Sequence, residues 1–230
     1  MKNRYFSLLL ICCLLIGGGY SNYKELNGVA IVVAMGLDYL PQEKKYIMIA
    51  QIINPSAIAS QTGSQGIPVI SVVAKGRTIS EAARLSSRKN SRTNIYSHVA
   101  LVALGETLVK KKSVKYIFDV FERDSKIRVN VPVIIARNNS VFEVLNTIPT
   151  LDKIPAKSIY GKIHNTSISL GENSENEIRE VISKISSKGR EPTINGVSIE
   201  NKNNTSESLA NMENAKSSYP FINGTGIFKN

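Results

Sequence analysis

The residue types that most often carry chemistry are few in this chain and lie apart from one another. The two cysteines, Cys12 and Cys13, fall in the first apolar run, so the rest of the chain has no thiol for a disulfide or a structural zinc site. The two histidines are His98, at the start of an apolar strand-like run, and His164, in a polar stretch. A lone histidine in such a place is more often structural than catalytic.

Three acidic residues on one predicted helix come closest to an acid–base pair. Asp119 and Glu122 mark the polar face of this helix, which also carries Asp124. A solvated helix face accounts for them better than general acid–base catalysis does. The chain has no P-loop, dinucleotide-binding fingerprint, nucleophile elbow or metal-ligand cluster. The sequence therefore predicts no catalytic residue, no cofactor and no metal site, and we do not expect an enzyme.

Basic residues are in excess, and four of them form a short run. The chain has 29 Lys and Arg against 18 Asp and Glu, and its formal net charge is +11. This excess fits an anionic neighbour, which could be a membrane surface, a nucleic acid or an acidic partner, and it fits equally a solvated basic surface. Lys110, Lys111, Lys112 and Lys115 join a predicted strand to a predicted helix, where they could contact anionic lipid or form only a loop. No nucleic acid is expected as a partner, because aromatic residues are not interleaved with these lysines.

The first 20 residues have the order of an export signal. Lys2 and Arg4 precede an almost unbroken apolar run at 7–16, and three glycines follow at 17–19. The apolar run is shorter than the roughly 20 residues that a membrane-spanning helix needs. We therefore expect residues 1–20 to be a signal or anchor segment. If uncleaved it would anchor the protein weakly, and cleavage after the glycines would release the protein.

No lipid attachment site is recognised in this segment. A lipoprotein signal needs a small residue directly before the lipid-bearing cysteine, since the thiol must fit the peptidase site. Cys12 follows Ile11, Cys13 follows Cys12, and both lie early in the apolar run, so both are poor candidates. At the end of the run, the chain has Gly19 and Tyr20 instead of a cysteine. We therefore expect no fatty acid on this protein.

The body of the chain alternates between strand-like and helix-like runs. Gly36 is expected to break the first strand, and Pro132 indicates that the fifth is an edge strand or carries a bulge. The five β-rich apolar runs are 29–38, 45–56, 68–76, 98–106 and 126–137.

Helix signals follow the third of these strands. Thr78 with Glu81, and Ser140 with Glu143, form capping boxes that predict two helix starts. Strands followed by strands interleaved with helices indicate an α+β or α/β fold, and of these we expect α+β, with helices packed on a mixed β-sheet. A third, amphipathic helix is predicted over 113–124, with the apolar stripe Val114, Ile117, Phe118 and Phe121.

The composition changes near 149–155. We therefore expect an N-terminal domain at 21–157 and a second, incomplete α+β region at 158–230.

The second region has a helix, a polar stretch and a final strand-like run. Ser174 and Glu177 are expected to cap a helix that ends at Gly189. The asparagine-rich stretch at about 196–218 is predicted to be an exposed polar loop. The final run at 219–230 reads either as an unpaired strand of a truncated domain or as a short edge strand that closes the earlier sheet.

Several segments resemble the C subunits of spore germinant receptors, the Ger(x)C family. KELN at 24–27 and GLD at 36–38 are similar to the opening of that family, and QIINP at 51–55 is similar to its next strand. No single motif is specific, but the set in this order is. The later similar segments are GRTISEAARLSSRKNSRTNIYSHVALVALGE, ERDSKIRVNVPVIIAR and GTGIFK.

The resemblance implies a lipoprotein without catalytic activity on the outer face of the spore inner membrane. It implies two integral-membrane partners, an A subunit and a transporter-like B subunit. It also implies that a nutrient ligand is sensed only through the assembled complex. Two features depart from the family: the cysteine expected near Gly19 or Tyr20 is absent, and the rest of the family's C-terminal region does not follow.

A second hypothesis is a secreted or membrane-associated small-molecule binding module unrelated to germination. It requires a ligand pocket within residues 21–157 and no membrane partner.

Overall fold

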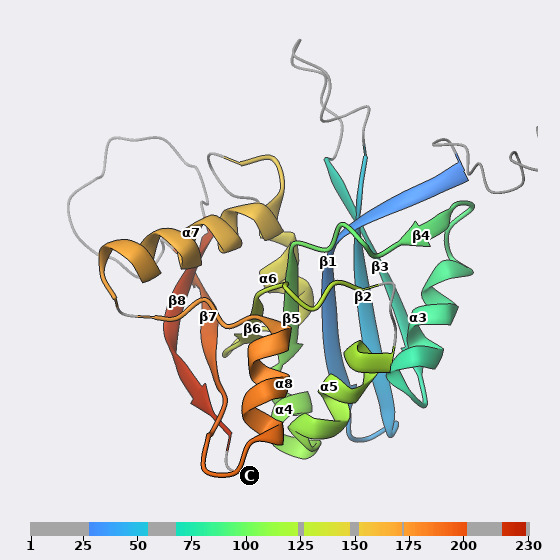
Figure 1. Cartoon of the computed structure of the whole chain (residues 1–230). Coiled ribbons are helices and arrows are strands. Elements are labelled where there is room, and N and C mark those ends of the chain that lie inside the picture. Colours follow the sequence, from blue (N-terminus) through green and yellow to red (C-terminus); the bar gives the residue numbers. More distant parts are fainter. Residues whose placement is uncertain are drawn as a thin grey trace, which may run out of the picture.

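The computed structural model describes residues 28–54, 68–123, 127–147, 152–171, 173–201 and 218–228. Eight strands in this part of the chain form one mixed sheet in the order β3-β2-β1-β5-β6-β7-β8, with β4 beside β1 (Figure 1). The pairs β1–β4, β1–β5, β5–β6 and β6–β7 are parallel, and the pairs β1–β2, β2–β3 and β7–β8 are antiparallel. The strands are β1 (Val29–Leu40), β2 (Lys45–Ile53), β3 (Val69–Gly76), β4 (Thr93–Ile95), β5 (Leu101–Gly105), β6 (Val133–Ala136), β7 (Thr193–Asn201) and β8 (Ser218–Ile227).

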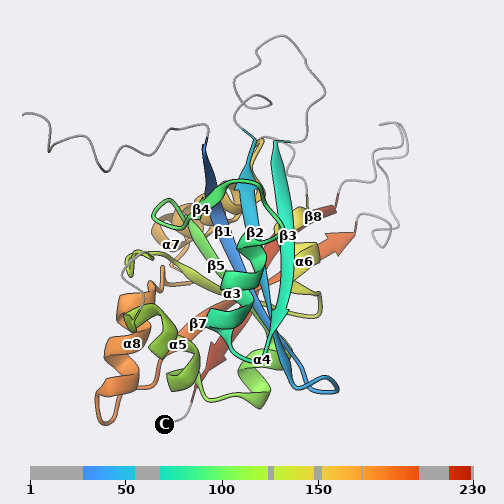
Figure 2. The same ribbon diagram turned by 90° about the vertical axis from the view of Figure 1, so that its right-hand side faces the viewer.

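Helices cover both faces of the sheet, which confirms the predicted α+β class (Figure 2). One face packs against α3, α4, α5 and α8, and the other packs against α6 and α7. The central strands β5 and β6 are buried at every residue, as expected for parallel strands covered on both sides. The helices are α3 (Ile79–Ser87), α4 (Glu106–Lys111), α5 (Val114–Arg123), α6 (Val141–Asn146), α7 (Pro155–Ser169) and α8 (Ile178–Ser186).

The predicted helix starts at residues 78 and 140 are confirmed. The Ser140 hydroxyl accepts from the Glu143 backbone N–H at 3.1 Å, and the Glu143 carboxylate accepts from the Ser140 backbone N–H at 2.8 Å. At α3, the Thr78 hydroxyl accepts from the Glu81 N–H at 3.1 Å, while the Glu81 carboxylate accepts from the N–H of Arg77. These bonds satisfy donors that a helix start leaves unpaired.

Two predictions about the strands were wrong. Gly36 does not break β1; it lies inside the strand, where a Cβ would come within 2.5 Å of Val141 Cγ1. The glycine therefore permits the close approach of α6. The predicted strand over 126–137 is reduced to β6, an interior strand, and Pro132 directly precedes it and bridges to Glu177. Because Pro132 lies just before β6, its missing N–H removes none of the hydrogen bonds that pair β6 with its neighbouring strands.

The C-terminal part also differs from expectation. The polar loop predicted at 196–218 begins later, because β7 extends to Asn201, and residues 202–217 lie outside the described residues. The final run is not unpaired: β8 pairs antiparallel with β7 and forms one edge of the sheet. The edge-strand alternative is therefore the correct one. The sheet also continues across the boundary expected at residue 157, since β7 pairs with β6.

Four elements were not predicted, and one cap was wrong. β4, α4, α7 and β7 had no counterpart among the predicted elements. Helix α8 exists, but its N-cap is Glu177, which makes no side-chain cap bond. The Ser174 hydroxyl instead accepts from Asn176 Nδ2 at 2.7 Å.

Candidate functional site: a basic cleft

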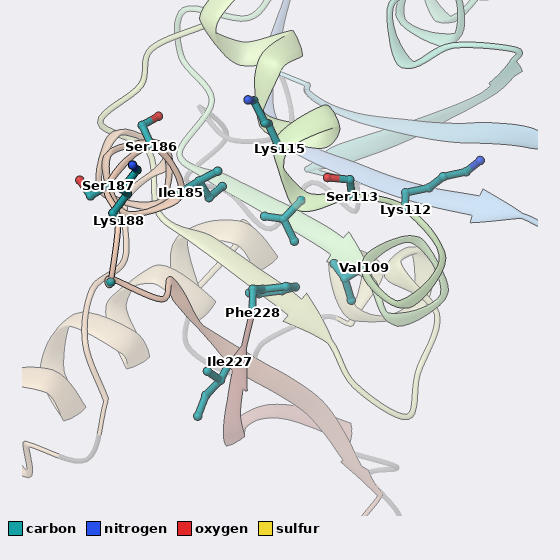
Figure 3. A pocket seen from close by; sticks show the side chains of 12 residues that line it. Val109, Lys112, Ser113, Lys115, Ile185, Ser186, Ser187, Lys188, Ile227 and Phe228 are labelled. Carbon is teal, nitrogen blue, oxygen red and sulfur yellow. The ribbon is translucent and has the colours of Figure 1, made fainter. Parts of the chain in front are cut away.

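A cleft lies where α4, α5, the C-terminal end of α8 and the end of β8 meet (Figure 3). Its volume is about 750 Å³. The apolar side chains that line it come from all four elements and from the residues directly after them, and they are Val109, Val114, Ile185, Ile227 and Phe228.

The rim of this cleft is positively charged. Lys112 and Lys115 line it from one side and Lys188 from the other (Figure 3). The segment 107–118 contains four lysines, the segment 181–190 contains two lysines and an arginine, and neither contains Asp or Glu. Cations on both walls of one cleft create a positive potential that an anionic group would relieve. We call the cavity together with these two segments the basic cleft.

Lys112 is held at the rim by aromatic rings. Its ammonium nitrogen lies 4.1 Å from the centroid of the Tyr39 ring and 5.5 Å from that of Tyr46. These cation–π contacts fix the side chain beside the β1–β2 hairpin. The phenol of Tyr39, and secondarily that of Tyr46, raise the pKa of Lys112, so the group is charged at neutral pH.

Two other cations of the cleft have partners. Lys110 forms an ion pair with Glu106 one helical turn away, at 2.5 Å between Nζ and Oε1. Lys184 Nζ donates to Asn176 Oδ1 at 3.4 Å. An exposed pair of this kind contributes little stability and does not neutralise the remaining charges.

Three lysines remain uncompensated. Lys111, Lys115 and Lys188 are exposed and have no hydrogen-bond or ion-pair partner within the described part of the chain. Their ammonium groups are free to bind an anionic group outside the domain.

The wall formed by α4 is positioned by Asp38, at the end of β1. The Asp38 carboxylate accepts from the backbone N–H of Tyr39 at 2.8 Å and from that of Leu108 in the first turn of α4. The N-cap residue of α4, Gly105, has no side chain, and a Cβ there would overlap the Asp38 carboxylate. Asp38 therefore supplies the cap for α4 from a neighbouring strand. Burial raises the pKa of Asp38, and its two backbone bonds act in the opposite direction.

The sequence GLD at 36–38 now has a physical explanation. Gly36 admits α6 on one face of the sheet, Leu37 is fully buried on the other, and Asp38 caps α4. A glycine, an apolar residue and an acid are thus each required by a different contact.

The residues that line the cleft are suited to binding a ligand. Ammonium groups, serine hydroxyls and an apolar floor suit a ligand that combines negative charge with apolar groups. The N-terminal end of α5 adds a partial positive charge at the same place.

The histidines singled out in the sequence lie elsewhere. His98 is exposed in a turn before β5, which begins only at Leu101. His164 lies on α7, with Nδ1 at 3.0 Å from Glu175 Oε2 and its ring stacked on Tyr160. This arrangement is that of a structural histidine on the surface.

The acidic residues of α5 do not line the basic cleft. Asp119 pairs with Arg123 at 2.8 Å, and Glu122 is exposed. Asp124 lies outside the described residues, as do Cys12, Cys13, Gly19 and Tyr20. The described residues contain no group of three or more His, Cys, Asp and Glu that could hold a metal ion. Among these same residues, no helix is both long enough and apolar enough to span a membrane.

A second cavity lies between α3 and α5 and has a volume of about 570 Å³. Met35 and Met48 of the sheet contribute to its floor, and Arg84, Tyr96 and Asp119 contribute polar groups. We call it the helix groove. Its volume is in the range of small-molecule sites.

Only one of the two walls of the basic cleft could be recognised in the sequence. The sequence shows the lysines at 110–115 as a run between a predicted strand and a predicted helix, whereas in the structure Lys110 and Lys111 belong to α4. The opposite wall, with Lys184 and Lys188, was missed because it is distant in sequence. The absence of acids from both segments was the available signal.

Comparison with known proteins gives the family. Residues 22–199 match the model of the family described as the spore germination protein N-terminal domain. The chain belongs to this family. The match begins before β1 and ends within β7, and it confirms the resemblance to germinant-receptor C subunits.

A relative from Bacillus subtilis (strain 168), spore germination protein KC, is 27% identical over 194 residues. The alignment covers 83% of this chain and 47% of the relative. The chain thus spans about half the length of this relative. No solved structure matches the chain.

Proposed function

We propose that this protein acts in spore germination as a non-enzymatic subunit of a nutrient germinant receptor. The observation that carries the proposal is the family match over residues 22–199, which spans the sheet from β1 into β7. The name of the Bacillus subtilis relative supports the same process. A cleft equipped for binding, with no constellation of acid, base and nucleophile around it, agrees with a subunit role.

The proposed location is the outer face of the spore inner membrane. The export signal expected at residues 1–20 would deliver the chain there. Its proposed partners are the integral-membrane A and B subunits, and a nutrient would be bound by the complex. Association with the membrane would then depend on these partners or on an uncleaved signal.

Deletion of the gene and fractionation of dormant spores test the proposal. We expect spores without this protein to lose absorbance more slowly after addition of the nutrient that the receptor senses, and re-introduction of the intact gene to restore the rate. We also expect the protein in the inner-membrane fraction, co-purifying with two multi-span membrane proteins. Normal germination of the deletion strain in every nutrient mixture, with the protein recovered only in soluble fractions, would refute the proposal.

The helix groove favours a second candidate function, a small-molecule binding module. The groove lies entirely within residues 35–127, where that hypothesis requires a pocket. Calorimetry of the isolated protein against amino acids, sugars and nucleosides tests it, with the variant Ala83→Trp as the control that fills the groove. Binding that the wild type shows and this variant lacks would support the module, and heats that are equal in both would not.

A further inference from the structure

The basic cleft carries positive charges that no acidic residue of the two segments balances. Lys112, Lys115 and Lys188 line the cavity, and the segments 107–118 and 181–190 carry four further cations and no acid. Like charges that face each other across a cavity repel, and this repulsion opposes the packing of α8 beside α5. Three of these seven cations, Lys111, Lys115 and Lys188, have no partner among the described residues. An anionic group from outside would remove the repulsion and use these free ammonium groups.

The shape of the cleft indicates what kind of anionic group fits. The site is concave, with a volume of about 750 Å³, and its floor is apolar. Ile227 is 65% exposed on this floor and Phe228 lies beside it (Figure 3). A polypeptide segment can place carboxylates against the lysines of the rim and apolar side chains against the floor at the same time, as in other grooves that bind peptides. A flat lipid surface would meet the rim but leave the floor unfilled.

The position of the cleft points the same way. Strand β1 begins at Val29, whereas Lys112, which lines the cleft, lies over the ring of Tyr39 at the other end of this strand. The strand between these points is about 33 Å long. The cleft is thus separated by the length of β1 from the point where the described chain begins, and it remains accessible to a partner protein.

We propose that the basic cleft docks an acidic segment of a partner protein. Carboxylates of the segment pair with Lys111, Lys115 and Lys188, and an apolar side chain packs on Ile227 and Phe228. The contacts would set partner choice and association rate mainly through complementary charge.

A labelled peptide tests this inference with the isolated protein. The probe is a fluorescein-labelled peptide of twelve residues that alternates Glu-Glu with Leu, and its binding is followed by fluorescence anisotropy. We expect binding that weakens as salt rises, because exposed charge pairs are screened. In the triple variant Lys111→Glu, Lys115→Glu, Lys188→Glu, we expect affinity at least about tenfold lower, the size of effect that loss of a few charge pairs produces.

A matched control separates the cleft from net charge. The variant Arg77→Glu, Arg128→Glu, Lys157→Glu changes the net charge by the same amount at exposed positions outside the cleft. We expect it to bind the peptide within about twofold of the wild type, since these positions do not line the cleft. Ile227→Ser tests the apolar floor without disturbing the core, and we expect about threefold weaker binding.

Several outcomes would overturn the inference. Equal loss of binding in both triple variants would show that only net charge matters. Binding to vesicles that contain phosphatidylglycerol, lost in the cleft variant while the peptide does not bind, would assign the cleft to lipid. A germination defect is not among the readouts, so the cleft can fail this test while the proposed function stands, and the reverse also holds.

Discussion

At the scale of single residues, two carboxylates near α4 show how position sets charge. Asp38 is partly buried at the end of β1, and this burial raises its pKa. Glu106, one residue after the N-cap of α4, is only partly buried, and its pKa is lowered by the Lys110 ammonium first and by the Asn138 backbone N–H second. Because the two pKa values shift in opposite directions, the two groups make stability depend on pH in opposite ways. Ionisation of Asp38 opposes folding, so its contribution favours the fold below its unfolded-state pKa and is lost as pH rises through its folded-state pKa.

Glu106 behaves in the opposite way. Its contribution to stability is present above its unfolded-state pKa and is lost as pH falls through its lowered folded-state pKa. In an NMR titration we expect the Asp38 carboxyl to titrate above 3.8 and that of Glu106 below 4.5. Lys110→Ala should move the midpoint of Glu106 upward and leave that of Asp38 in place. It should cost about 0.3–0.5 kcal/mol of unfolding free energy at pH 7 and nothing once Glu106 is protonated. An upward shift of both midpoints in this variant would contradict the assignment.

Among the glycines that the structure describes, Gly105 has the least room for a side chain. A Cβ at Gly105 would overlap the Asp38 carboxylate and push it away from the start of α4. We expect Gly105→Ala to lower the unfolding free energy by about 2–4 kcal/mol, as overpacking and a lost cap combine. Gly161, on α7, has open space at the same atom. The control Gly161→Ala should raise stability by about 0.5–1 kcal/mol, since alanine is the better helix former. Urea unfolding measures both, and equal effects would disprove the role of Asp38.

At the scale of elements, α5 is held by its aromatic stripe. Phe118 and Phe121 are each 1% exposed, with ring centroids 5.9 Å apart, and they anchor the wall of the basic cleft to the sheet. We expect Phe118→Ala to cost about 3–5 kcal/mol of unfolding free energy, the range for a buried phenylalanine that leaves a cavity.

The matched control for this prediction lies on α6. Phe142 is 47% exposed, so Phe142→Ala should cost less than about 1 kcal/mol. Thermal unfolding followed by circular dichroism compares the two. Similar melting temperatures for the two variants would place the stripe on the surface.

Helices and strands could be predicted where a single local sequence pattern was strong. Apolar runs identified β1, β2 and β3, the apolar stripe identified α5, and a Thr or Ser followed three residues later by Glu identified the starts of α3 and α6. Helix α7 was not predicted because its buried face includes Ser158, whereas the apolar side chains of Tyr160 and Ile168 are exposed, so apolar and polar residues are not separated between its two faces. Strand β7 was not predicted because it buries polar residues, whose side chains form hydrogen bonds to distant parts of the chain. Asn195 Nδ2 donates to the Ser174 carbonyl at 2.7 Å, and the Ser198 hydroxyl donates to that of Arg137 at 3.0 Å.

At the scale of the whole molecule, the sheet decides which part of the chain is a unit. The boundary expected at residue 157 follows a change in composition, but β6 has β5 on one side and β7 on the other. Helix α8 also covers the same face of the sheet as α5. The residues beyond 157 that fill the core are fully or almost fully buried, and they include Ile178, Val181, Ile194 and Val197.

A fragment of residues 21–157 is therefore expected not to fold cooperatively. It lacks the four buried side chains just named, and burial of each contributes about 1.5–3 kcal/mol, or about 6–12 kcal/mol together. This sum is comparable to the whole unfolding free energy of a domain, which is about 5–15 kcal/mol. The fragment would also expose the edge of β6, whose residues are buried on both faces, and such an edge invites aggregation.

The test compares fragments of increasing length in thermal unfolding and in binding of a hydrophobic dye. Residues 21–201 retain α8 and β7 and lack only the edge strand β8, so we expect a cooperative transition at a lower temperature than that of residues 21–230. Residues 21–157 should show a broad transition and strong dye binding, because the core is open to water. If this shortest fragment instead unfolded sharply at the temperature of the full chain, residue 157 would be a true domain boundary. The later strands would then be an addition to a finished sheet, and α8 would be free to move as a separate wall of the basic cleft.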